Sequence, residues 1–177
     1  MSQEQFDIVD ENNQLLGIQK PRSIVHSKIL DWHRATHIWI VNDQGKVLCQ
    51  QRSLTKDANP GKWQSFFGGH VIAGQTYDQN AVQELKEELG LNIQVSDLTS
   101  LYIRKSESAR HFSQVYVMRW NGDASSFQFD KGEVAYIRWF TMSELEEAMK
   151  NSEFCNGIDE KVVELSGWRY PKASQNP

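Results

Sequence analysis

Apolar and polar residues alternate along several short runs of the chain, and this pattern predicts strands for much of its length. Two runs within about 5–20 flank the turn-forming residues 11–13 and predict an N-terminal hairpin. The same kind of pattern predicts further strands at 23–26, 36–41, 46–51, 98–104, 114–120 and 134–140.

The segment 77–89 has the periodicity of a helix instead. Its apolar residues recur every three or four positions, and these are Ala81, Val82, Leu85 and Leu89. Gly90 follows where a left-handed residue commonly ends a helix. A capping box that starts at Thr141 predicts C-terminal helices over about 142–168. Together these elements predict a single domain over 1–177, of the α/β (α+β) class with a mixed sheet.

The composition is that of an ordinary globular protein, with 39% hydrophobic and 24% charged residues. A net charge of −4 and a pI near 5.7 offer no basic surface for a nucleic-acid polymer. Neither a secretion signal nor a membrane-spanning run is visible, so a cytoplasmic location is expected. The two cysteines form no disulfide framework, and Cys49, which lies in a predicted strand, is expected to be buried.

The predicted helix carries three acidic side chains on one face. At about 100° per residue, Glu84, Glu87 and Glu88 fall within an arc of roughly 100°, opposite the apolar residues. Like charges this close repel, and a hard divalent cation such as Mg²⁺, which takes oxygen ligands, would remove that repulsion. For three glutamates alone, a solvated helix face is the better explanation. The glycines Gly68 and Gly69 before the helix favour a ligand site, because glycine lets the backbone approach a ligand closely.

Taken together, residues 69–91 resemble the Nudix box. That motif reads Gly, five residues, Glu, seven residues, Arg-Glu, an aliphatic residue, any residue, Glu-Glu, any residue, Gly and an aliphatic residue. The matching positions are Gly69, Glu84, Leu85, Glu87, Glu88, Gly90 and Leu91. The resemblance extends from about residue 10 to 145 and implies the Nudix fold, an α/β/α sandwich. It also implies that Glu84, Glu87 and Glu88 bind Mg²⁺ (or Mn²⁺) and catalyse hydrolysis of a diphosphate bond in a nucleoside diphosphate derivative or similar small metabolite.

Two positions depart from the motif. Gln75 stands where the family has its first glutamate, and Gln83 stands where it has arginine. Because a neutral amide only partly imitates an arginine that orients a carboxylate, weaker metal binding or slower turnover is expected. The departures also keep open a second hypothesis, a non-catalytic module that binds a phosphorylated ligand. The residue that takes the proton from the attacking water is open as well, among Glu87, Glu88 and Glu133.

Other segments are similar to the metal-dependent isopentenyl diphosphate isomerases, which share the Nudix fold. These segments are 22–26, 33–37, 51–56, 60–63 and 69–70. In those enzymes, histidines that match His26, His33 and His70 bind a metal, and basic residues that match Arg52 and Lys56 contact the substrate diphosphate. The resemblance therefore implies an additional metal site and two substrate-binding residues.

Isomerisation needs a proton donor and a proton acceptor on opposite faces of the alkene. The isomerases use a cysteine and a glutamate, and the corresponding positions here hold Gly68 and His111. Isomerase activity is therefore disfavoured and kept as a third hypothesis.

Two further expectations concern the surroundings of the site. Gly69 and Trp63 are expected to contact the substrate, with Trp63 and Phe66 or Phe67 forming an aromatic wall, although core packing explains these aromatic residues equally well. The N-terminal hairpin is a candidate contact for a homodimer.

Overall fold

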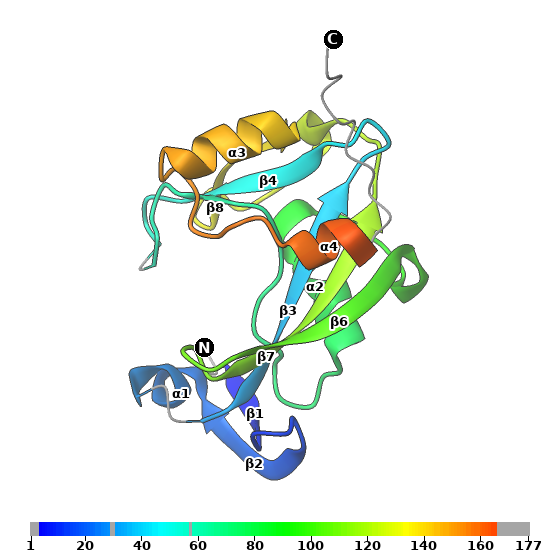
Figure 1. Cartoon of the computed structure of the whole chain (residues 1–177). Coiled ribbons are helices and arrows are strands. Elements are labelled where there is room, and N and C mark those ends of the chain that lie inside the picture. The colour runs from blue at the N-terminus through cyan, green and yellow to red at the C-terminus, as the bar shows by residue number, and fades with distance from the viewer. Residues whose placement is uncertain (1–3, 29–30, 57, 166–177) are drawn as a thin grey trace.

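A mixed six-stranded sheet forms the body of the fold, and a separate two-stranded hairpin lies at one end of it (Figure 1). The computed structural model describes residues 4–28, 31–56 and 58–165. The strands are β1 (Gln5–Val9), β2 (Leu15–Pro21), β3 (His33–Val41), β4 (Val47–Arg52), β5 (Trp63–Gln64), β6 (Leu98–Ser106), β7 (His111–Arg119) and β8 (Val134–Phe140). The α-helices are α1 (Arg22–Lys28), α2 (Tyr77–Leu89), α3 (Met142–Lys150) and α4 (Glu160–Leu165), and short 3-10 turns occupy Val95–Asp97 and Ala124–Ser126.

The sheet has the order β5-β4-β3-β7-β6, and β8 pairs with β4. Strands β3 and β7 are parallel over their whole length, from His33 opposite His111 to Val41 opposite Arg119. The remaining pairs are antiparallel. This confirms the predicted mixed sheet.

Helices cover both faces of the sheet, because successive side chains of β3 point to opposite sides. Ile38 and Ile40 pack with the apolar side of α2 in one core cluster. Trp39 and Val41 pack in a second cluster with residues of α3 and α4. Figure 1 shows α3 over β4 and β8, with α2 and α4 on opposite sides of β3. The result is the expected α/β/α sandwich.

The bounds or types of three elements differ from the sequence-based expectation. The strand expected at 23–26 is wrong, since α1 occupies this segment and turns Val25 into contact with Phe6 and Ile8. The strands β3 and β7 each begin three residues earlier than predicted, because each supplies the other with a hydrogen-bonding partner there. No sequence pattern shows that pairing.

The predicted hairpin and the helix at 77–89 are both confirmed. Strand β2 leaves Leu15, Leu16 and Ile18 about half exposed, and the homodimer contact expected for this hairpin stays a prediction. The predicted second C-terminal helix begins at Glu160, and its expected end at 168 lies outside the described residues. Cys49 is fully buried, as expected. Among the described helices, none has the length and apolar character needed to cross a membrane.

Candidate active site on helix α2

Helix α2 has a sharply defined start and end, and this sets the positions of its acidic residues. The Thr76 side chain accepts a hydrogen bond from the Gln79 amide, and the Gln79 side chain closes a capping box. At the other end, Gly90 adopts a left-handed conformation (φ 69°) and donates to the last carbonyls. Leu85 and Leu89 are buried against the sheet, so the intervening glutamates point away from this core.

Glu88 is held by two neutral donors. The backbone amide of Gly68 donates to Oε2 of Glu88 at 2.8 Å, and the side-chain amide of Gln50 donates to Oε1 at 3.3 Å. Burial raises the pKa of Glu88 to about 7, although both hydrogen bonds oppose that shift because they favour the charged form. A carboxylate this costly to ionise gains from a nearby cation.

Glu84 lies against the glycine turn. Asn80, one turn earlier on α2, donates to Oε1 of Glu84 at 3.4 Å and to the His70 carbonyl at 3.1 Å. A Cβ atom added at Gly69 would lie 2.6 Å from the same Oε1, so this position has room only for glycine while Glu84 keeps its conformation. Burial, followed by repulsion from Glu88 and Glu87, raises the pKa of Glu84 to about 8.

Glu87 is the exposed member of the group. Gln83 donates to its Oε1 at 2.7 Å, and Gln75 donates in turn to Oε1 of Gln83 at 2.6 Å. Each of the three glutamates is thus oriented by an uncharged donor. The two departures from the Nudix box, at Gln75 and Gln83, lie next to each other in space.

The donor set suits a hard divalent cation. Among the described residues, no lysine or arginine forms an ion pair with Glu84, Glu87 or Glu88. Glu84 and Glu88 are thus half-buried carboxylates with no directly paired cation, and oxygen ligands are what Mg²⁺ and Mn²⁺ prefer. The residue types fit such an ion, but the oxygens of Glu84, Glu87 and Glu88 do not all lie within 4.8 Å of one another, so these side chains would have to move closer together to bind it as a set of three.

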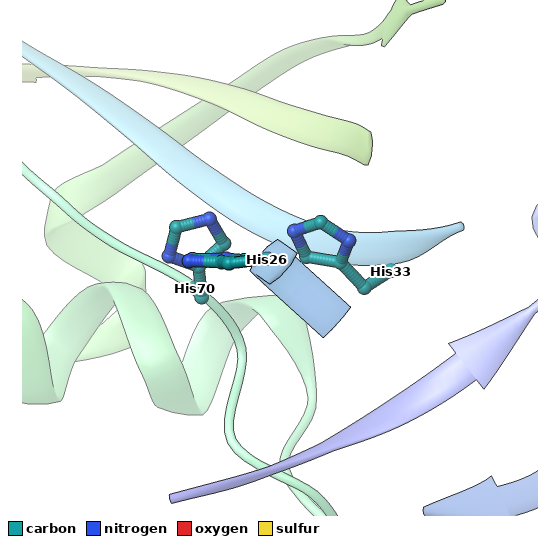
Figure 2. Close-up of side chains that lie close together, drawn as sticks. All are labelled: His26, His33 and His70. Carbon is teal, nitrogen blue, oxygen red and sulfur yellow. The ribbon is translucent and has the colours of Figure 1, made fainter. Parts of the chain in front are cut away.

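Beside these glutamates, a group of histidines converges from three parts of the chain (Figure 2). His26 comes from α1, His33 from the start of β3 and His70 from the glycine turn. One ring nitrogen of each histidine lies within 4.8 Å of those of the other two. Among the described residues, these three are close enough together to hold a metal ion. The ring nitrogen Nε2 of His33 is buried without a hydrogen-bond partner. Such an atom is costly unless something binds it.

These rings are neutral near physiological pH. Burial, with a smaller contribution from the neighbouring histidines, lowers the pKa of His33 to about 4 and that of His70 to about 2. The ring of His111 lies 5.8 Å from that of His33, and it lines the same cavity. The sequence singled out His111 only as the residue that replaces an isomerase glutamate. Its place in this group follows from the parallel pairing of β3 with β7.

His37 lies further along β3 and belongs to a packed rather than a ligand-binding environment. Its ring stacks on Phe66 at 4.0 Å between centroids, and its Nε2 lies 3.4 Å from the Ser113 hydroxyl. Burial lowers the pKa of His37 to about 3. With it, all five histidines of the chain lie in one region of the fold.

The basic residues expected to contact substrate are already engaged with the protein. Arg52 donates to the Ala58 carbonyl at 2.9 Å and to Gln64 at 3.3 Å. Lys56 forms an ion pair with Glu133, and both charges act on Glu88. Lys56 is therefore near the carboxylates, and Glu133 is its partner.

The aromatic residues near the site differ in how deeply they are buried. Phe67 is fully buried in the core below α2, so it forms no part of an exposed wall. Trp63 packs edge-on against Phe140 at 4.9 Å, and Phe66 is half-buried against His37. Core packing accounts for Trp63 and Phe67, and the substrate contact expected of Trp63 stays a prediction.

Comparison with known proteins agrees with the fold and the box. The family model of the NUDIX domain matches residues 31–156. A Nudix hydrolase 3 of Arabidopsis thaliana is 31% identical over 81% of the chain, which spans 20% of that protein's length. An uncharacterised Nudix hydrolase of Clostridium acetobutylicum is 30% identical over 96% of the chain and 85% of its own length. Another, from Streptomyces coelicolor, is 32% identical over 93% of the chain and 89% of its own length.

Solved structures show the same fold. A crystal structure of a Deinococcus radiodurans protein covers 96% of this chain and all (100%) of its own with a TM-score of 0.71 at 22% identity. The NUDIX domain of NrtR from Shewanella oneidensis, crystallised with ADP ribose, covers 76% of this chain and 85% of its own with a TM-score of 0.54 at 15% identity.

The chain therefore belongs to the Nudix family. Within it, the chain is a Nudix hydrolase, an enzyme that acts on phosphorus-containing anhydrides.

Proposed function

We propose that the chain cleaves a diphosphate bond in a nucleoside diphosphate derivative or similar small phosphorylated metabolite, in a reaction that depends on Mg²⁺ or Mn²⁺. The observation that carries this proposal is the face of α2. Glu84 and Glu88 are half-buried carboxylates with raised pKa values, and no basic side chain of the described part of the chain forms an ion pair with them. Lys56, whose charge acts on Glu88, is itself paired with Glu133.

Glu84, Glu87 and Glu88 would hold the cation. When bound, such an ion polarises phosphoryl oxygens and lowers the pKa of a water ligand. The protein orients the carboxylates through the Gly68 amide, Asn80 and Gln83. These donors orient each carboxylate before a ligand arrives, and cation binding would draw the three side chains closer together.

Glutamine variants test this site and separate its roles. We expect Glu84→Gln and Glu88→Gln to weaken Mn²⁺ binding, measured by calorimetry, and to lower kcat by more than about 100-fold, because changes to residues that merely orient a ligand already cost about 10–100-fold. The candidates for the proton acceptor are Glu87, Glu88 and Glu133. Glu133 alone of these lies outside the proposed cation ligands, so Glu133→Gln would lose kcat while retaining Mn²⁺ binding if Glu133 is the acceptor, whereas Glu87→Gln would lower both. If all four variants kept wild-type Mn²⁺ affinity and turnover, the proposed site would be wrong.

On the substrate side, we place Arg52 and Lys56 at the diphosphate. Lys56 is paired with the exposed Glu133, and a phosphate would compete with that carboxylate for the ammonium group. We expect Lys56→Ala to raise KM by roughly tenfold, equivalent to about 1.4 kcal/mol of binding. The control is Lys131→Ala, an exposed lysine in the same loop as Glu133.

A panel of substrates distinguishes the three hypotheses. It contains ADP ribose, the ligand of the Shewanella oneidensis domain, together with nucleoside diphosphates and isopentenyl diphosphate. Metal-dependent release of phosphate or a monophosphate supports hydrolysis. Tight binding without turnover of any compound favours a binding module. Deuterium uptake from heavy water into isopentenyl diphosphate would instead show isomerase activity, for which the chain would need a substitute for the cysteine that Gly68 replaces.

We also propose that His26, His33 and His70 form a second metal centre. The compact set of ring nitrogens and the unpaired Nε2 of His33 support it. Neutral imidazoles favour borderline cations such as Zn²⁺ over Mg²⁺. We expect purified protein to bind about one equivalent of Zn²⁺ and His70→Ala to lose it, with metal content measured by mass spectrometry. Equal Zn²⁺ content in the variant and the wild type would contradict this centre.

A further inference from the structure

Gln75, Gln83 and Glu87 form a chain of side chains whose hydrogen-bond direction is fixed. A carboxylate only accepts hydrogen bonds, so Gln83 must turn its NH₂ group toward Glu87, 2.7 Å away. The Oε1 of Gln83 then faces Gln75, which must present its own NH₂ group across 2.6 Å. The remaining Oε1 of Gln75 is buried without a partner. The orientation of both amides therefore follows from the charge on Glu87.

We infer that Gln75 and Gln83 act together as positioning residues that hold Glu87 for cation binding, an inference that rests on the proposed function of this site. Relative to the Nudix box, the change at 75 removes a negative charge and the change at 83 removes a positive one. The two changes cancel, so the net charge around the carboxylates is the same as with the glutamate–arginine pair. We name this chain of two amides the amide relay.

The amide relay gives each of its members a distinct role. Gln83 touches Glu87 directly and limits where its carboxylate can lie. Gln75 acts only through Gln83, because its NH₂ group occupies the Gln83 oxygen and keeps the amide from turning over. Gln75 is itself fixed by its backbone amide, which donates to the Ile72 carbonyl at 3.0 Å. The expectation that both departures simply weaken the site treats them as independent, whereas they form one connected replacement.

Reversing the direction of the relay is the sharpest test. Gln83→Glu is almost the same size but places an acceptor against Glu87. Gln75→Glu demands a hydrogen-bond donor from Gln83, which must then turn its oxygen toward Glu87. We expect each variant to weaken Mn²⁺ binding by roughly tenfold, the lower end of the usual cost for a residue that orients a metal ligand. We expect kcat to fall by a similar factor, with little change in KM for the substrate.

Rescue by arginine separates this role from simple packing. A guanidinium group has donors on several sides, so Gln83→Arg can donate both to Glu87 and to the group at position 75. In the double variant Gln75→Glu/Gln83→Arg, we expect Mn²⁺ affinity to return to within about threefold of wild type. If Gln75 and Gln83 act together, adding Gln83→Arg to the Gln75→Glu variant raises its Mn²⁺ affinity instead of lowering it further.

A matched control is Lys86→Gln, an exposed position on the same helix that lowers the formal charge by one unit, as Gln83→Glu does. Circular dichroism and thermal unfolding show whether each variant is folded. Should Gln83→Glu bind Mn²⁺ as Lys86→Gln does, or the double variant fail to recover affinity, the relay is refuted. In either of these cases the proposed function stands if Glu84→Gln and Glu88→Gln still weaken Mn²⁺ binding and lower kcat, and it fails separately if they do not.

Discussion

The backbone amide of Gly68 donates a 2.8 Å hydrogen bond to the carboxylate of Glu88, twenty residues later in the chain. To present that amide, Gly68 adopts φ +114°, a region that side chains disfavour. The same geometry brings its Cα against the Thr36 carbonyl of β3. One residue thus joins the sheet to the carboxylate face of α2. A side chain at this position, such as the cysteine that the isomerase resemblance would require, has no space.

We predict that Gly68→Ala destabilises the fold itself. Its Cβ atom would lie 2.4 Å from the Thr36 carbonyl oxygen, and backbone atoms on both sides must move to relieve the contact. Strained backbone and overpacking each cost about 1–3 kcal/mol, so we expect a loss of at least roughly 2 kcal/mol in the free energy of unfolding. Urea denaturation measures it. Unchanged stability would show that the turn is not tightly fixed.

Gly69→Ala is predicted to act on the site rather than on the fold. Here the new Cβ atom would meet the end of a flexible side chain, Oε1 of Glu84, at 2.6 Å, and that side chain can move away. We expect stability to fall by less than about 1 kcal/mol, whereas metal-dependent turnover falls by roughly 10–100-fold. Gly157→Ala is the control, since its Cβ atom would meet nothing within 4 Å. Full activity in Gly69→Ala would mean that the Glu84 conformation seen here is not required.

Asn80 is predicted to contribute to both stability and the site. It is buried, accepts a 2.7 Å hydrogen bond from the Thr36 hydroxyl, and donates to Glu84 and to the His70 carbonyl. Asn80→Ala leaves the buried Thr36 hydroxyl with only a longer contact to the Gly69 carbonyl, at 3.5 Å, and we expect this to cost about 1–3 kcal/mol. Because Thr36→Val removes the same hydroxyl, the two changes should be less than additive in a double-mutant cycle of unfolding free energies. Strict additivity would argue against this contact.

The titratable groups predict a maximum of stability near pH 6.5 in the metal-free protein. The folded state holds His33, His37 and His70 at pKa values of about 4, 3 and 2, below the 6.5 of a free histidine, so their contribution is complete above pH 6.5 and is lost as the pH falls. The pKa values of Glu84 and Glu88 are raised to about 8 and about 7. Their contribution to stability is therefore complete below pH 4.5 and is lost progressively as the pH rises from 4.5 through 7 and 8.

Denaturation in EDTA between pH 4.5 and 8.5 measures both limbs of this profile. His37→Phe keeps the stacking on Phe66 but removes one proton-binding group, so the acid limb should become flatter by up to about 1.4 kcal/mol per pH unit. Glu84→Gln should flatten the alkaline limb and steepen the acid limb above about pH 4.5, because between pH 4.5 and 8 Glu84 binds a proton in the folded state but not in the unfolded state. An acid limb that His37→Phe does not alter would place the His37 ring in a more solvated position than the structure does.

Helix α2 shows what can be predicted from the sequence alone. Its start, its end at Gly90 and its acidic face all follow from residues close together in the chain, because capping and helical spacing are local interactions. The Nudix box is likewise a local pattern. It predicted the fold, which is confirmed, and the roles of Glu84, Glu87 and Glu88, which stay a prediction. The strand expected at 23–26 failed for the complementary reason. A short apolar segment has no strong local preference, and the contact of Val25 with Phe6 decided in favour of a helix.

Tertiary structure decided everything that depends on partners distant in the chain. Only the parallel register of β3 and β7 brings His111 opposite His33, and only the fold of the glycine turn brings the Gly68 amide to Glu88. The sequence marked Gln75 and Gln83 as two separate departures, and the turn before α2 made them one hydrogen-bonded chain. Residue types and local spacing carry the chemistry of individual side chains, but hydrogen bonds require atoms within about 3 Å, and chain folding alone sets those distances.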